Sequence, residues 1–410
     1  MFLCGPAHHI AVRLSFLRSK GKLRSLQGLT PRLFEVICPS DEELCRLHGE
    51  QLEELAAFKQ QYLGSPEWRA FCERHTGTCS AMIRQPVASG KYYSSTATSL
   101  RAELQECLAE PAANLAGGPC LHCAPEQRRH LRGLIVPHGS TSDSGFAAAA
   151  AYLALKQQLG LYGTRGHPGS PRPLRCVVLG TNHFTNLPLA CLSTATAWRT
   201  PLGDVPVDAD LNAALQQQGL PFNDTPHNLE HSIENQLPFF QHVLESVPNP
   251  GHYGRPLSIA PVCVGWLGSA QQAQQLGQQL LAALRQAQAQ HPDQAPPLLI
   301  ATSDFTHAGP AYNEPPDAPW MSLREHCIWR DSPLLHAVCM GGAERFLDIC
   351  AATGTSLCGR WPVAAFLAVA QAAGWQVELL SYAPSDLYVS SGNINGFAAF
   401  AAWQTLHSAA

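Results

Sequence analysis

The sequence predicts a single large α/β domain whose mostly parallel central sheet is flanked by helices. From residue 132 onward, short apolar runs alternate with helical stretches, which is the pattern of parallel strands joined by crossover helices. The chain of 410 residues is 45% hydrophobic and only 14% charged, so it carries enough apolar surface for one large core. We therefore expect residues 81–410 to form one folded domain.

The predicted strands are short runs rich in apolar and β-branched residues. They are Arg132–Val136, Leu174–Leu179, Leu257–Val264, Leu298–Thr302, Val377–Tyr382 and Gly396–Phe400. The predicted helices between them are Phe146–Gln158, Gln271–Gln290 and Pro362–Ala373. Gly160 and Gly374 follow two of these helices and favour their termination. The alternation supports the α/β fold class, and Ala308–Trp320 is predicted to be a loop.

The amino-terminal region differs in composition from this domain. Residues 1–34 contain six Lys or Arg and no acidic residue, which is typical of an organellar transit peptide and also fits a disordered basic extension. Residues 35–80 are predicted to be a helical extension. Within it, Ser40–Leu63 has apolar residues at helical spacing, and Ser40 with Glu43 forms a capping box.

Charge and cysteine usage exclude several classes of function. A net charge of −4 lacks the basic footprint that nucleic-acid binding requires. No apolar run reaches the length of a membrane span. The 15 cysteines are odd in number and scattered, so we expect reduced thiols and a cytoplasmic location, with organellar targeting as the alternative. Cys120 and Cys123 form one isolated pair, which favours a flexible insertion over structural zinc.

Three predicted strands run directly into residues that bind metals or transfer protons. His138 follows the first strand, His183 follows the second, and Asp304 with His307 follows Leu298–Thr302. The carboxyl ends of parallel strands lie at one edge of a sheet, where loops form a crevice. We therefore expect these four side chains to converge, although a single histidine at a strand end is equally often structural.

Cys358 precedes a predicted helix and is followed by Arg360. A helix amino terminus and a nearby guanidinium both favour the thiolate, which is the form that binds metal or attacks an electrophile. Most buried cysteines are small hydrophobic residues, so the sequence context leaves both interpretations open.

A competing motif is His227-x-x-Glu230-His231, which matches the HxxEH pattern of inverted zinc peptidases. On a helix, His227 and His231 would share one face. A zinc hydrolase using these three residues is therefore an alternative, although the sequence identifies no third metal ligand. The other interpretation is a polar helix start with Glu230 and Glu234 in its first turn.

Six separate segments, in order, resemble the Memo family, the mediator of cell motility, whose bacterial relatives are called AmmeMemoRadiSam system protein B. The similarity covers roughly Gln85–Trp403. The segments are Pro137-His138 with Ser144-Gly145, Leu179-Gly180-x-x-His183, Trp198–Asp204, Glu230–Glu234, Ser303-Asp304-Phe305-x-His307 and Cys358-Gly359-Arg360-x-Pro362.

This resemblance implies a fold like that of class III extradiol dioxygenases and a mononuclear iron(II) or copper site, with zinc less favoured. The implied metal ligands are His138, His183 and Cys358. It also places acid/base candidates beside the metal or near the same cavity, and these are Asp304, His307, His231 and Glu234.

Two hypotheses about function follow. In the first, the chain is a redox-active metalloprotein, a non-haem metal-dependent oxidoreductase, in which His307, oriented by Asp304, transfers protons. In the second, it is a metal-carrying or peptide-binding adaptor without turnover. Both predict a small-molecule or peptide ligand in the metal crevice, and neither excludes protein partners.

Overall fold

The structure is a computed structural model, and it describes residues 83–113, 129–163, 173–185, 189–247, 257–388 and 392–405. Side-chain burial is described within the same ranges except for residues 161–163. The predicted basic segment 1–34, the predicted helical extension 35–80 and the Cys120/Cys123 pair lie outside the described residues.

An eight-stranded mixed sheet forms the centre of the described fold, with strand order β10-β11-β2-β8-β3-β7-β4 and β9 paired to β11. Its strands are β2 (Arg129–Val136), β3 (Leu174–Thr181), β4 (Ala190–Leu192), β7 (Leu257–Val264), β8 (Leu298–Thr302), β9 (His307–Ala308), β10 (Gln376–Pro384) and β11 (Ile394–Thr405). The four central strands β2, β8, β3 and β7 are parallel. Strands β4, β10 and β11 pair antiparallel. The predicted α/β fold is confirmed, and the parallel arrangement holds for the centre of the sheet.

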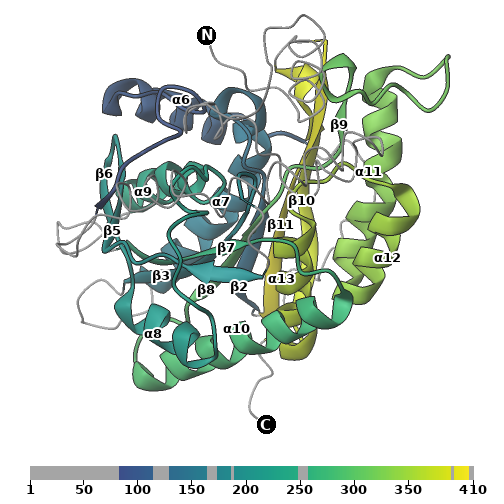
Figure 1. The fold of residues 1–410 in the computed structure, drawn as a ribbon. Coiled ribbons are helices and arrows are strands. Elements are labelled where there is room, and N and C mark those ends of the chain that lie inside the picture. Colours follow the sequence, from purple (N-terminus) through teal and green to yellow (C-terminus); the bar gives the residue numbers. More distant parts are fainter. Residues whose placement is uncertain are drawn as a thin grey trace, which may run out of the picture.

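Helices cover both faces of this sheet, as Figure 1 shows. They are α6 (Ala97–Ala109), α7 (Thr141–Gly163), α8 (Ala209–Gln217), α9 (Leu237–Ser246), α10 (Ala270–Gln290), α11 (Leu323–Met340), α12 (Ala343–Thr353) and α13 (Arg360–Ala373). Side chains alternate along each strand, so Val177 and Leu179 pack with α8, α10 and α13 on one face. Cys176 and Val178 pack with α6, α7 and α9 on the other. One sheet thus separates two apolar layers.

A small second sheet lies beside the main one and contains β1 (Ile83–Arg84), β5 (Ala197–Thr200) and β6 (Gly203–Pro206), in the order β1-β5-β6. The tight turn between β5 and β6 contains Gly203, whose φ of 124° is disfavoured for residues with a side chain. Short 3₁₀ turns occur at η1 (Glu234–Gln236), η2 (Pro310–Tyr312) and η3 (Ser385–Leu387). Residues 308–320, predicted as a loop, therefore include the short turn η2.

Among the described residues, no helix combines the length and apolar character needed to cross a membrane.

Candidate metal centre

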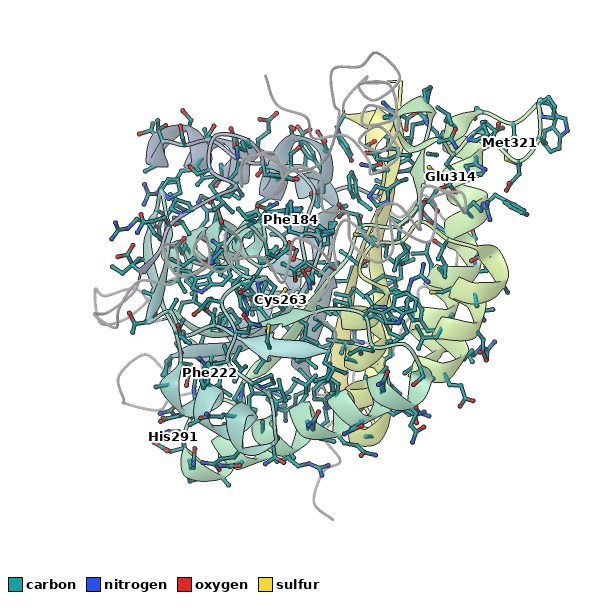
Figure 2. All side chains as sticks on the ribbon, in the orientation of Figure 1. Phe184, Phe222, Cys263, His291, Glu314 and Met321 are labelled. Atoms are coloured by element: carbon teal, nitrogen blue, oxygen red, sulfur yellow. The ribbon has the colours of Figure 1, made fainter. Side chains whose placement is uncertain are left out.

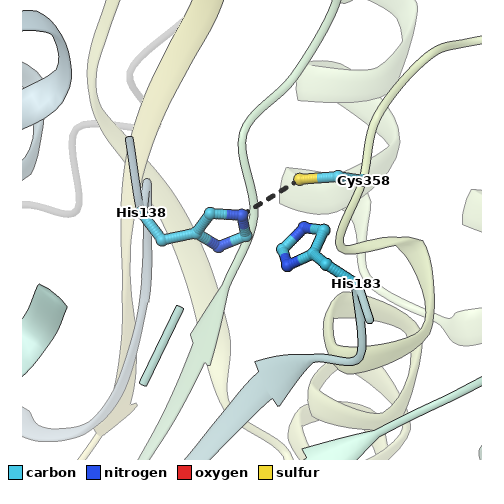
Figure 3. A group of neighbouring side chains, drawn as sticks. All are labelled: His138, His183 and Cys358. Atoms are coloured by element: carbon cyan, nitrogen blue, oxygen red, sulfur yellow. Dashed lines mark hydrogen bonds between the residues drawn. The ribbon is translucent and has the colours of Figure 1, made fainter. Parts of the chain in front are cut away.

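The carboxyl-terminal edge of the parallel strands brings three potential metal ligands together. His138 follows β2, His183 follows β3, and Cys358 lies just before α13. One ligand atom from each of the three lies within 4.8 Å of the others. Nε2 of His138 is 3.1 Å from Sγ of Cys358, and Figure 3 shows the ring of His183 beside both. The predicted convergence of strand-end histidines occurs, and Cys358 completes the group.

The backbone around His138 is held by buried hydrogen bonds. Its N–H donates to Oδ1 of Asp304 at 2.7 Å, and the N–H of Gly139 donates to the same oxygen at 3.2 Å. Nδ2 of Asn235 donates to the carbonyl of His138 at 2.7 Å. Burial, assisted by the charge of His183, lowers the pKa of His138 to about 3. The ring is therefore neutral at physiological pH, which is the form that ligates a metal.

Glu230 orients the ring of His183. Nδ1 of His183 lies 3.0 Å from Oε1 of Glu230, and the backbone N–H of His183 donates to Oε2 at 2.9 Å. Burial alone would raise the pKa of Glu230, but the charge and hydrogen bond of His183 hold it well below its usual value. An ionised carboxylate accepts the Nδ1 proton, which is how carboxylates orient metal-binding histidines. Burial opposes a charge on His183, but the charge of Glu230 and the hydrogen bonds with Cys358 and Glu230 raise the pKa of this histidine well above its usual value, so a metal ion would replace the proton on Nε2.

The predicted arrangement of His227 and His231 on one helix face is wrong. Residues 225–229 form turns, and helical structure begins only at Glu234. Nε2 of His227 lies 3.2 Å from the carbonyl of Cys191, and burial lowers the pKa of this histidine to about 4. Among the described residues, His227 is in no group of three potential metal ligands, so the geometry expected of a zinc peptidase is not formed.

Asp304 and His307 lie next to Cys358, and the three form a second group of close ligand atoms. The N–H of Asp304 points to Sγ of Cys358 at 3.4 Å. Burial raises the pKa of Asp304, and the charge of His307 partly offsets this effect. Nδ1 of His307 is 3.0 Å from the carbonyl of Ser356, so that carbonyl holds a protonated Nδ1. The sequence predicted only Asp304 as the residue that orients this ring.

His231 lines the cluster between two aromatic rings. It stacks on Tyr92 with ring centroids 4.3 Å apart and on His183 with centroids 4.9 Å apart. Phe184, labelled in Figure 2, meets the His231 ring edge-on at 6.0 Å. Burial lowers the pKa of His231 well below its usual value, although the charge of Glu230 opposes this. A neutral, stacked imidazole therefore forms one wall of the site.

The structure does not bring the carboxylate of Glu234 into this cluster. The carboxylate is fully buried and lies 2.6 Å from the guanidinium of Arg84. It also accepts the N–H groups of Val87 and Ala88 at 2.9 Å and the hydroxyl of Tyr93. With four donors around it, Glu234 anchors the segment that follows β1.

The fold and the site together define an α/β protein with a partly buried His–His–Cys group of the kind that can hold a metal ion. A family model described as Memo-like protein matches residues 84–398. The chain belongs to this family, as its ordered motifs predicted.

The chain aligns with nearly the full length of two archaeal relatives. A MEMO1 family protein of Methanopyrus kandleri is 28% identical over 329 residues, covering 78% of this chain and 98% of the relative. A MEMO1 family protein of Aeropyrum pernix is 30% identical over 321 residues, covering 77% and 95%. A solved structure of an uncharacterized protein from Escherichia coli K12 covers 65% of this chain at 10% identity with a TM-score of 0.36, too low to inform the fold.

Proposed function

We propose that this chain is a metalloprotein in which His138, His183 and Cys358 hold one redox-active iron or copper ion. The observation that carries the proposal is the convergence of their three ligand atoms within 4.8 Å. Imidazole suits iron, copper and zinc, while a thiolate makes the centre oxidisable and favours softer ions. Three protein ligands also leave coordination positions open for a small-molecule or peptide ligand.

The spacing of the ligand atoms supports one shared ion. Bonds of about 2.1 Å to nitrogen and about 2.3 Å to sulfur span about 3.1 Å when they meet at a right angle and about 3.6 Å at the tetrahedral angle. Nε2 of His138 and Sγ of Cys358 are 3.1 Å apart. This separation lies within the range that two ligands of one ion span.

The residues around the ion have distinct roles in this proposal. A bound iron or copper ion supplies electron transfer and Lewis acidity. His307, whose Nδ1 is held by the Ser356 carbonyl, presents Nε2 as the atom that accepts or donates a proton. Asp304, whose pKa is raised by burial, holds the His138 backbone through Oδ1. The stack of Tyr92, His231 and His183 would hold the His183 ring in a fixed orientation beside the ion.

Metal analysis of protein purified without oxygen tests the proposal. We expect about one iron or copper ion per chain in the unmodified protein, loss of that ion in His183→Ala, and full occupancy in the control His227→Ala. His227 is fully buried but contacts the carbonyl of Cys191. Unchanged occupancy in His183→Ala would refute the site, and loss in His227→Ala would restore the zinc-hydrolase alternative.

A turnover measurement distinguishes the oxidoreductase hypothesis from the adaptor hypothesis. Metal-dependent oxygen consumption with an added catechol is the result expected of an oxidoreductase. Stoichiometric peptide capture that survives metal removal, without oxygen consumption, would favour the adaptor instead.

Glu230→Gln should weaken metal binding about 10- to 100-fold, because an amide cannot accept the Nδ1 proton of His183 as strongly and can turn a donor toward it. A competition titration with a chromogenic chelator measures the change. Asp208→Asn is the matched control, since Asp208 is also buried and hydrogen-bonded, but to Arg175 at 2.7 Å. Equal weakening in both variants would mean that the effect reflects general destabilisation.

A further inference from the structure

A buried carboxylate outside the ligand cluster holds the connector that follows β8. Asp331 lies on α11 and is fully buried. Its Oδ1 accepts the backbone N–H of Thr306 at 3.0 Å and the hydroxyl of Thr306 at 2.6 Å. Its Oδ2 accepts the hydroxyl of Tyr382, on β10, at 2.7 Å. The carboxylate thus joins α11, β10 and the connector through three hydrogen bonds.

This connector, residues 303–306, carries Asp304 and leads directly into His307. The N–H of Gly396, on β11, donates to the carbonyl of Thr306 at 2.8 Å, and the N–H of Phe305 donates to the carbonyl of Gly396 at 2.9 Å. A Cβ atom on Gly396 would lie 2.0 Å from Oδ2 of Asp331, so only glycine lets β11 pass against the carboxylate. Strand β11 and helix α11 therefore fix the same short connector from two sides.

The connector is in turn bonded to the thiol of the ligand cluster. The N–H of Asp304 points to Sγ of Cys358 at 3.4 Å, and the N–H of Cys358 donates to the carbonyl of Asp304 at 3.3 Å. A shift of Thr306 would therefore move Asp304, His307 and the surroundings of the Cys358 sulfur together.

Stability alone gives little reason for a carboxylate here. Burial raises the pKa of Asp331 to about 7, despite the hydrogen bonds from Thr306 and Tyr382 that lower it. A buried polar network commonly costs as much free energy as it returns and can be replaced by apolar packing. What a fully hydrogen-bonded network does supply is one defined geometry.

We propose that Asp331 is a positioning residue for the candidate metal centre: its carboxylate sets the conformation of residues 303–306 and so places Asp304 and His307 beside Cys358. The inference rests on the proposed function of that centre. It adds to the site a residue of α11 that belongs to none of the motifs identified in the sequence.

The test compares Asp331→Asn with Asp331→Leu. Asparagine keeps an oxygen for Thr306 and offers an amide donor to the oxygen of Tyr382, whereas leucine has the same branched shape and no acceptor. In metal-free protein, nitrogen NMR of the His307 ring should report the wild-type Nδ1–H tautomer for Asp331→Asn and a mixture of tautomers for Asp331→Leu. Metal affinity should fall about tenfold or more in the leucine variant and be retained in the asparagine variant.

Val338→Ala is the matched control, since Val338 is fully buried on the same helix and packs in the apolar core. It should lower stability without altering the His307 signals. If the leucine variant does not fold, Tyr382→Phe replaces it in the test, because it removes one of the three hydrogen-bond donors to Asp331. It should shift the His307 NMR signals to a smaller extent.

Unchanged His307 signals in Asp331→Leu and Tyr382→Phe, or an equal change in Val338→Ala, would overturn the inference. Because the NMR measurement uses metal-free protein, it decides the positioning role separately from metal binding. A wild-type chain that binds no metal would refute the proposed function, whereas the NMR result would still decide whether Asp331 positions His307.

Discussion

Glu234→Gln should lower the free energy of unfolding by about 3–5 kcal/mol, the usual cost of leaving a buried ion without its partner. The substitution removes the charge that Arg84 contacts at 2.6 Å and places amide hydrogens against the donors that Glu234 now accepts. Arg84 also donates to the carbonyls of His227 and Glu230 and lies 4.0 Å over the ring of Trp198, so its own position should loosen. Urea denaturation at neutral pH measures the change.

Glu245→Gln is the control for this prediction. Glu245 forms an ion pair with Arg101 at 2.8 Å, but both side chains are more than two-fifths exposed. Such exposed pairs contribute about 1 kcal/mol or less, because water screens both charges. A loss for Glu234→Gln no larger than that for Glu245→Gln would contradict the anchoring role of the buried pair.

Gly359→Ala should destabilise the protein by about 1–3 kcal/mol, the usual cost of overpacking, and should also disturb the candidate metal centre. A Cβ atom at this position would lie 2.3 Å from the backbone oxygen of Thr302 and 2.5 Å from Cβ of Ser303. Relief of this clash must displace either the end of β8 or the neighbouring Cys358. Thermal unfolding and a chelator competition titration measure the two effects.

Gly160→Ala should change stability in the opposite direction. Gly160 lies within α7, and an added Cβ would meet no atom within 4 Å. Alanine there should raise stability by about 0.5–1 kcal/mol, because it lowers the entropy of the unfolded chain and favours the helix. Wild-type stability and metal affinity in Gly359→Ala would show that the segment before α13 accommodates the extra atom.

The central strands could be predicted from sequence because they are continuous apolar runs. Leu257–Val264 and Leu298–Thr302 have the predicted bounds, since both are almost entirely buried. Strand β2 begins three residues earlier than predicted, at Arg129. Arg129 pairs with Glu378 of β10 at 2.9 Å, and a polar strand end held by such a distant partner has no local sequence pattern.

Helix α11 was not predicted, because its buried face contains polar residues. His326 and Asp331 are fully buried there, and Pro333 lies inside the helix, so the apolar period is broken. Ser322 and Glu325 nevertheless form a capping box at its start. That pair could have predicted the start of the helix from the sequence.

Some residues of the candidate site could also be predicted from the sequence, and others could not. Position at strand ends was enough to expect His138 and His183 to converge, whereas Cys358 depended on the family motifs. The role of Glu230 was not apparent, since it lies 47 residues from the histidine it orients. Ser356 bonds the ring of His307 across 49 residues, and only the folded chain brings such pairs together.

The wide separation of the ligands along the chain has a practical consequence. His138 and Cys358 are 220 residues apart and meet only when the end of β2 and the segment before α13 are assembled in the folded chain. An ion held by them binds the native state alone, and at 100 times its dissociation constant it adds about 2.7 kcal/mol of stability. Metal retention would then serve as a quality assay for recombinant preparations, distinguishing completely folded molecules from collapsed but incompletely paired ones.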